Sequence, residues 1–128
     1  MRVKMVYCAG PFSAPTREGV EANIAAMVRL GIEVAKLGGF PVVPHSNTSA
    51  PEYEQVQPYP FWIEGTLELM RRCDAVMLAQ NWAQSSGARG ERLEAIGIGM
   101  PVFETLAELA GWLNPSAVSD ALKARGER

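Results

Sequence analysis

The residues best suited to chemistry in this sequence follow a short apolar segment in the second half of the chain. Residues 75–79 are apolar and of strand length, residues 80–86 form a polar loop, and Gly87 opens a segment with helical spacing. Ser85 and Ser86 lie at the predicted helix start, where their hydroxyl groups can cap the helix and free backbone N–H groups can bind an anion such as a phosphate. Glu91 follows about one helical turn later, so we expect its carboxylate to face the same crevice as the loop.

Alternating strands and helices must position this segment. Apolar runs predict strands at residues 3–9, 40–43, 74–79 and 100–103, and helical spacing predicts helices at residues 20–37, 58–72, 87 to 97 or 99, and 104–113. This order is typical of an α/β fold, and we expect a single-domain parallel sheet of four to five strands with helices on both faces, flavodoxin-like or Rossmann-like. The domain is predicted to span residues 1–113, and residues 114–128 are predicted to be a C-terminal tail or short helix.

Three polar loops are expected at the carboxyl edge of this sheet, where parallel α/β folds bind ligands. They are residues 10–17, 45–57 and 80–86. Arg17 and Arg89 could pair with a phosphate, although most surface arginines have no such role. His45 is the only histidine, and its ordinary pKa of about 6.5 suits proton transfer, although a loop histidine can equally be polar surface.

Other polar and aromatic residues near these loops have two interpretations each. Asn47 and Asn81 could hydrogen-bond a polar ligand, but asparagine is also common in turns. Trp82 could stack on a flat ligand or pack in the core or at a subunit interface. Asp74, at the start of a predicted strand, could cap the preceding turn or take a catalytic or orienting role.

Composition limits the kinds of partner. The chain has 128 residues and a net charge of −2, so we expect no long nucleic acid as partner. Cys8 and Cys73 are predicted to be reduced thiols of a cytoplasmic protein. The amino terminus does not resemble a signal peptide, no segment is apolar enough to suggest a membrane span, and no cysteine or histidine cluster suggests a metal.

Four segments, in their order and spacing, resemble the nucleoside 2-deoxyribosyltransferase superfamily, which includes 2'-deoxynucleoside 5'-monophosphate N-glycosidases. The resemblance covers roughly residues 1–113 and is strongest to the short, mostly uncharacterised bacterial and phage branch. The matching segments are residues 7–12, 73–76, 86–91 and 99–103.

The resemblance implies an enzyme that cleaves the N-glycosidic bond of a deoxynucleoside or nucleotide. Glu91 matches the family's glutamate nucleophile, whose glycosyl ester is released to water in hydrolysis or to another base in transfer. It implies no metal or organic cofactor, and a homodimer or larger homo-oligomer with sites near subunit contacts. The residues implied to bind substrate are Tyr7, Gly10, Pro11, Phe12, Ser85, Ser86 and Gly87.

One position departs from the family pattern. Relatives usually carry an aspartate eight residues before Asp74, and here that residue is Thr66. Glu64 and Glu68 flank it, but two residues along a helix is a rotation of about 200°, so neither occupies its place. The acid role would then fall to another group, with His45 and Glu64 as candidates. The alternative is a nucleotide-binding or sensing module without catalysis.

Overall fold

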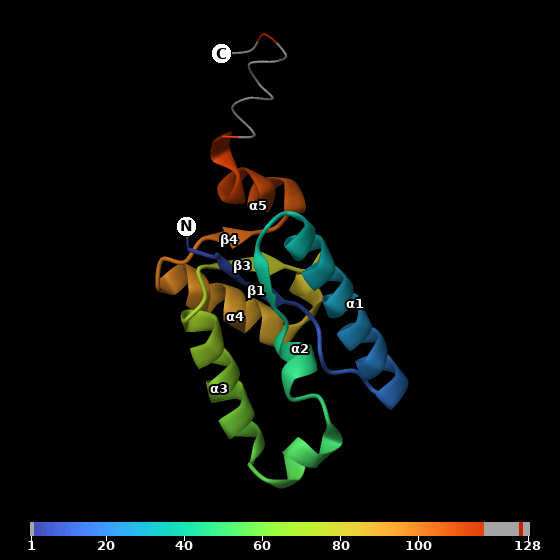
Figure 1. Cartoon of the computed structure of the whole chain (residues 1–128). Helices are drawn as coiled ribbons and strands as arrows, with labels where there is room; N and C mark the ends of the chain where they lie inside the picture. Colours follow the sequence, from blue (N-terminus) through green and yellow to red (C-terminus); the bar gives the residue numbers. More distant parts are fainter. Residues whose placement is uncertain (1, 117–125, 127–128) are drawn as a thin grey trace.

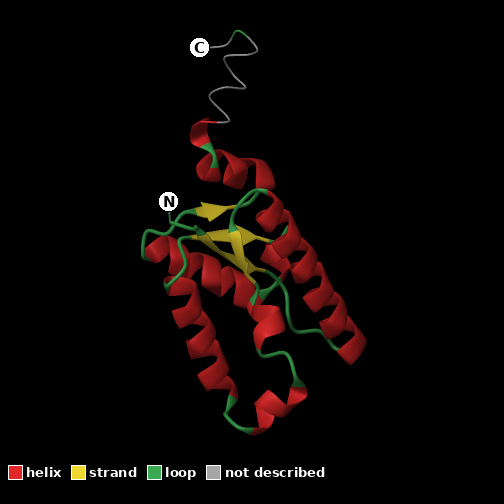
Figure 2. Cartoon of the chain, viewed as in Figure 1, coloured by secondary structure: helices red, strands yellow, loops and turns green. Residues whose placement is uncertain are grey.

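Four parallel strands form one sheet in the order β2-β1-β3-β4. The computed structural model describes residues 2–116 and 126, and the strands are β1 (Met5–Ala9), β2 (Phe40–Val42), β3 (Ala75–Leu78) and β4 (Val102–Phe103). Helices cover both faces of the sheet (Figure 1, Figure 2). The predicted flavodoxin-like or Rossmann-like α/β fold is therefore confirmed. Of the predicted tail, residues 117–125, 127 and 128 lie outside the described residues.

Local capping signals decide where the helices begin. The first helix starts three residues earlier than predicted because the Thr16 side chain accepts a hydrogen bond from the Gly19 N–H at 3.0 Å. Residues 45–57, predicted to be irregular, contain a short α-helix and a 3₁₀-helix, each with proline at its first position. The helical segments are α1 (Arg17–Lys36), α2 (Pro44–Asn47), η1 (Pro51–Gln55), α3 (Tyr59–Arg71), η2 (Trp82–Gln84), α4 (Ser86–Gly97) and α5 (Leu106–Leu113).

Alternate residues of β1 enter two separate hydrophobic cores. Val6 and Cys8 pack in the core beneath α1 and α5, whereas Tyr7 and Ala9 pack in the core beneath α3 and α4. All four are fully buried, which explains why the central strands are continuous apolar runs rather than alternating ones. Among the described residues, no helix is long and apolar enough to cross a membrane.

The carboxyl ends of β1 and β3 lie side by side. Ala9 is in register with Leu78, and the Ala79 N–H donates to the Ala9 carbonyl at 2.7 Å. From here the chain leaves β1 toward β2 on one side, and leaves β3 toward β4 on the other. This is the switch point at which open α/β sheets form their ligand crevice.

A substitution at Gly10 can measure how tightly the residues at this switch point pack. A Cβ at Gly10 would lie 2.5 Å from Met27 Sδ and 2.7 Å from Ala79 Cβ, so we expect Gly10→Ala to lower the free energy of unfolding by about 1–3 kcal/mol. Urea denaturation measures the change. The control is Gly65→Ala in α3, where a Cβ meets nothing within 4 Å and should add up to about 1 kcal/mol of stability. Equal effects of the two substitutions would contradict this packing.

Candidate active site

Tyr7 and Glu91 form a hydrogen-bonded pair between the sheet and α4. Tyr7 is fully buried in the middle of β1, and its hydroxyl donates to Glu91 Oε2. Glu91 lies in the second turn of α4 and is partly buried. Tyr7 therefore holds one carboxylate oxygen and leaves Oε1 available to another group.

Burial changes the protonation of both members of the pair. Loss of water around Glu91 raises the pKa of its carboxyl to about 7, although the hydrogen bond from Tyr7 acts in the opposite direction. Burial, together with the neighbouring Glu91 carboxylate, raises the pKa of Tyr7 well above its ordinary value. Tyr7 therefore stays a neutral donor, while Glu91 changes charge near neutral pH.

The start of α4 presents polar groups of the predicted kind. Ser85 is the N-cap, and its side chain accepts a hydrogen bond from the Ala88 N–H at 3.1 Å, so the capping prediction is confirmed. Ser86 and Gly87 are the first two helical residues and are exposed. The positive end of the helix dipole and its free N–H groups are thus open to an anion one turn before Glu91.

His45 holds the loop that follows β1 rather than standing free in the site. It is only 5% exposed, and its Nε2–H donates to the Gly10 carbonyl at 2.9 Å. The Phe12 ring lies against the imidazole, with 5.7 Å between ring centroids. Burial lowers the pKa of His45, so the ring is neutral at pH 7. This arrangement ties the end of β2 to the Gly10–Phe12 segment and does not favour the proton-transfer role considered from the sequence.

Two carboxylates considered for acid or orienting roles lie elsewhere. Asp74 accepts hydrogen bonds from the Met5 N–H and the Arg2 guanidinium, each at 2.7 Å, at the amino edge of the sheet. These partners hold the pKa of Asp74 below its usual range. The Glu64 side chain is 73% exposed and lies 3.7 Å from Arg71. Neither carboxylate is hydrogen-bonded to Glu91, so no contact with the Glu91 carboxyl supports the acid or orienting roles considered for them from the sequence.

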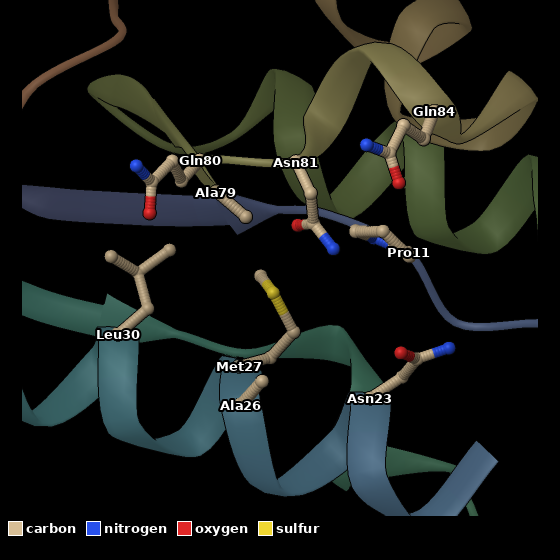
Figure 3. Close-up of a pocket in the computed structure, with 9 residues that line it drawn as sticks. All are labelled: Pro11, Asn23, Ala26, Met27, Leu30, Ala79, Gln80, Asn81 and Gln84. Carbon is tan, nitrogen blue, oxygen red and sulfur yellow. The ribbon is translucent and has the colours of Figure 1, made fainter. Parts of the chain in front are cut away.

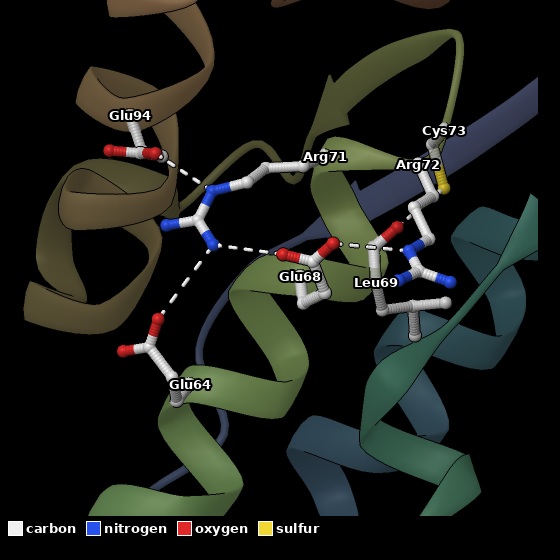
Figure 4. A network of polar contacts seen from close by, with 7 residues as sticks. All are labelled: Glu64, Glu68, Leu69, Arg71, Arg72, Cys73 and Glu94. Atoms are coloured by element: carbon white, nitrogen blue, oxygen red, sulfur yellow. Dashed lines mark hydrogen bonds and ion pairs between the residues drawn. The ribbon is translucent and has the colours of Figure 1, made fainter.

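Arg71 is a residue whose importance the sequence interpretation missed. It extends from α3 to α4, where its Nε donates to Glu94 at 3.0 Å, and its Nη1 pairs with Glu68 at 3.2 Å (Figure 4). This network fixes α3 against α4 one turn beyond Glu91. The i, i+3 spacing of Glu68 and Arg71 was readable from the sequence, but the contact with Glu94 required the packing of the two helices.

Thr66 is turned to its own helix. Its hydroxyl donates to the Trp62 carbonyl at 2.7 Å, and its side chain is partly buried. A threonine hydroxyl has no titratable proton near neutral pH. Thr66 therefore does not supply a general acid at this position.

The remaining predicted binding residues are distributed over several elements. The Arg17 side chain pairs with Glu21 on the surface of α1, and the Arg89 side chain donates to the Ala83 carbonyl. Trp82 packs in the core beneath α3 and α4, with the Arg92 guanidinium 4.8 Å above its ring. The other three line two pockets: Asn47 at β2, and Pro11 and Asn81 between α1 and the loop after β3.

No curated protein matches the chain. A family model described as "Domain of unknown function (DUF4406)" matches residues 4–104. These residues include all four strands and both members of the Tyr7–Glu91 pair. The chain belongs to this family. Among the described residues, no three histidine, cysteine, aspartate or glutamate side chains are grouped as metal ligands.

The raised pKa of Glu91 predicts a pH-dependent stability. Its folded-state pKa of about 7 lies above the unfolded value of 4.5, so the folded protein binds this proton more tightly. The contribution of this proton to the free energy of unfolding is complete below pH 4.5 and is lost as pH rises through 7. The free energy of unfolding changes by up to about 3 kcal/mol over this range. We expect Glu91→Gln to remove this loss when unfolding is measured in urea from acidic to alkaline pH.

The matched control is Glu52→Gln, which removes an exposed carboxylate in η1. This variant should follow the pH profile of the unmodified protein. Parallel profiles for Glu91→Gln and the unmodified protein would contradict the buried environment of Glu91.

Proposed function

We propose that this DUF4406 family member cleaves the N-glycosidic bond of a nucleoside, a deoxynucleoside or the corresponding 5'-monophosphate, with Glu91 as nucleophile. The observation that carries the proposal is the buried Tyr7 hydroxyl bonded to a single oxygen of Glu91. The resemblance to the nucleoside 2-deoxyribosyltransferase superfamily supports the same assignment. No metal or organic cofactor enters the proposed reaction.

The proposed reaction has two balanced steps. Glu91 Oε1 attacks the anomeric carbon as the bond from that carbon to the base nitrogen breaks, and the base takes the bonding electrons and a proton from water. Water, or the nitrogen of a second base, then attacks the anomeric carbon as its bond to the carboxylate breaks, and the proton that this nucleophile loses neutralises the hydroxide left by the first step. Tyr7 fixes the orientation of the nucleophile and remains protonated throughout.

The start of α4 offers a place for a 5'-phosphate. The N–H groups of its first turn, the Ser86 hydroxyl and the positive end of the helix dipole all favour an anion there. Ser85 uses its hydroxyl to cap the helix and accept from Ala88, which leaves its own O–H proton for donation. Monophosphates should therefore be better substrates than nucleosides.

A second candidate function is nucleotide binding without turnover, in a sensing module. The arrangement of acids favours it. Thr66 stands where the deoxyribosyltransferase superfamily that the sequence resembles usually has an aspartate, and among the described residues only Tyr7 is hydrogen-bonded to the Glu91 carboxylate. With His45 engaged by Gly10, no described histidine is free to protonate a leaving base. Binding would then use the same helix start and loops.

Base release distinguishes the two functions. Purified protein is incubated with each ribo- and deoxynucleoside and its 5'-monophosphate, and free base is measured by chromatography. We expect Glu91→Gln to abolish release, while Glu52→Gln, which removes an exposed carboxylate of η1, retains it. A nucleotide-induced rise in melting temperature without base release would support the binding module. If the protein shows neither base release nor a rise in melting temperature, both candidate functions are contradicted.

The Tyr7–Glu91 hydrogen bond also predicts a pH profile. Because the nucleophile must be ionised, kcat/KM should rise with pH around a midpoint near 7. Tyr7→Phe removes a hydrogen bond that lowers this pKa, so the midpoint should move to higher pH and activity should fall about ten- to a hundredfold. An unchanged midpoint in an active Tyr7→Phe variant would contradict the orienting role.

We also propose that the protein is a cytoplasmic homodimer or larger homo-oligomer. Several large apolar side chains are exposed on α4 and around the start of α3, and apolar side chains gathered on a surface are typical of an interaction site. They include Leu93, Ile96 and Ile98, together with Tyr53, Val56, Tyr59, Phe61 and Ile63.

Light scattering during size-exclusion chromatography tests the oligomer. We expect a mass that is a multiple of 13.9 kDa, and a smaller species for Leu93→Glu because a buried unpaired charge is costly. Ala22→Glu on the exposed side of α1 is the control and should leave the mass unchanged. A monomer mass for the unmodified chain would contradict the proposal.

A further inference from the structure

A pocket lies at the switch point, on the face of the sheet opposite Glu91. It has a volume of about 560 Å³, within the range of small-molecule sites, and is open between α1 and the loop after β3 (Figure 3). Met27, which lines the pocket, packs in the core beneath α1 and α5. Tyr7, the hydrogen-bond partner of Glu91, packs in the core beneath α3 and α4. Strands β1 and β3 therefore separate the two sites.

The pocket combines an apolar floor with carboxamide groups. Met27, Leu30 and Ala79 supply apolar surface, and a methionine thioether is a favourable neighbour for an aromatic ring. Four of the lining residues carry carboxamides, and none of the lining residues is charged. The carboxamides are Asn23, Gln80, Asn81 and Gln84.

Three of the carboxamides border the same space. Asn81 and Gln84 extend from the loop after β3 into the space above α1, and Asn23 extends from α1 beside Pro11 (Figure 3). Asn23 Nδ2 donates to the carbonyls of Phe12 and Ser13 at 3.0 and 3.3 Å. Its amide is thereby oriented, and Oδ1 is left as a fixed acceptor on the pocket side.

We propose that this pocket binds an uncharged, planar heterocycle with both donors and acceptors on its edge, the class to which free nucleobases belong. Asn23 accepts through Oδ1, and the other three carboxamides can each donate and accept, so together they match such an edge in either sense. An anion or a cation would lose hydration without gaining a charged partner. The proposal does not depend on the proposed glycosidase activity, because Glu91 and Tyr7 do not line the pocket.

Titration of the full chain with adenine, cytosine and uracil, followed by ¹⁵N-resolved NMR, tests the proposal. The side-chain NH₂ signals of Asn81 and Gln84 should shift with at least one base, and that of Gln55 in η1 should not. Inorganic phosphate and benzene are the charged and apolar probes, and neither should produce the same shifts. Binding to Glu91→Gln should be unchanged, which keeps this test separate from the catalytic one.

Substitutions locate the ligand. Asn81→Leu and Gln84→Leu should each weaken binding about fivefold, as expected for loss of one neutral hydrogen bond. Ala26→Phe places a ring in the pocket from an exposed position of α1 and should abolish binding. Gln55→Leu, the matched carboxamide control, should bind as the unmodified protein does.

Three results would overturn the proposal. The first is the absence of shifts at Asn81 and Gln84 with every base at millimolar concentration. The second is unchanged affinity in Ala26→Phe. The third is base binding that shifts the signals around Glu91 instead, which would place the heterocycle in the proposed active site.

Discussion

The hydrogen bond between Tyr7 and Glu91 is the interaction on which the candidate chemistry depends. A buried tyrosine hydroxyl needs an acceptor, and a carboxylate withdrawn from water needs a donor. The Tyr7 hydroxyl is the donor and the Glu91 carboxylate is the acceptor, so this hydrogen bond links α4 to the middle of β1. The same burial raises the pKa of Glu91 to about 7. The same hydrogen-bonded pair therefore satisfies two buried polar groups and contains the carboxyl that titrates near neutral pH.

The parallel sheet gives the molecule two chemically different faces at one switch point. Neighbouring residues of β1 point to opposite faces of the sheet. Tyr7 reaches Glu91 on the α4 side, whereas Gly10, directly after the strand, lies close to Met27 on the α1 side. The loop after β3 serves both. It contributes Asn81 and Gln84 to the uncharged pocket and then, through Ser85, caps the helix that carries Glu91.

Several polar residues near the strands form hydrogen bonds or ion pairs within the protein that hold the fold together. Asp74 pairs with the Met5 N–H at the amino edge, His45 holds the Gly10 carbonyl, and Arg71 joins α3 to α4. Buried backbone and charged groups must find partners somewhere, and polar side chains near strand ends are the nearest source. Their positions in the sequence resemble those of catalytic groups for this reason.

The sequence by itself determined the order of strands and helices, the parallel sheet and the cap at Ser85, because these follow from apolar runs, helical spacing and local hydrogen bonding. It also singled out Glu91 from its spacing after the loop and from a family resemblance. Only the tertiary structure decided which residues come together: Tyr7 with Glu91, His45 with Gly10, and Asn23 in one pocket lining with Asn81. Such pairings join distant parts of the chain, and local periodicity carries no information about which distant side chains share one buried space.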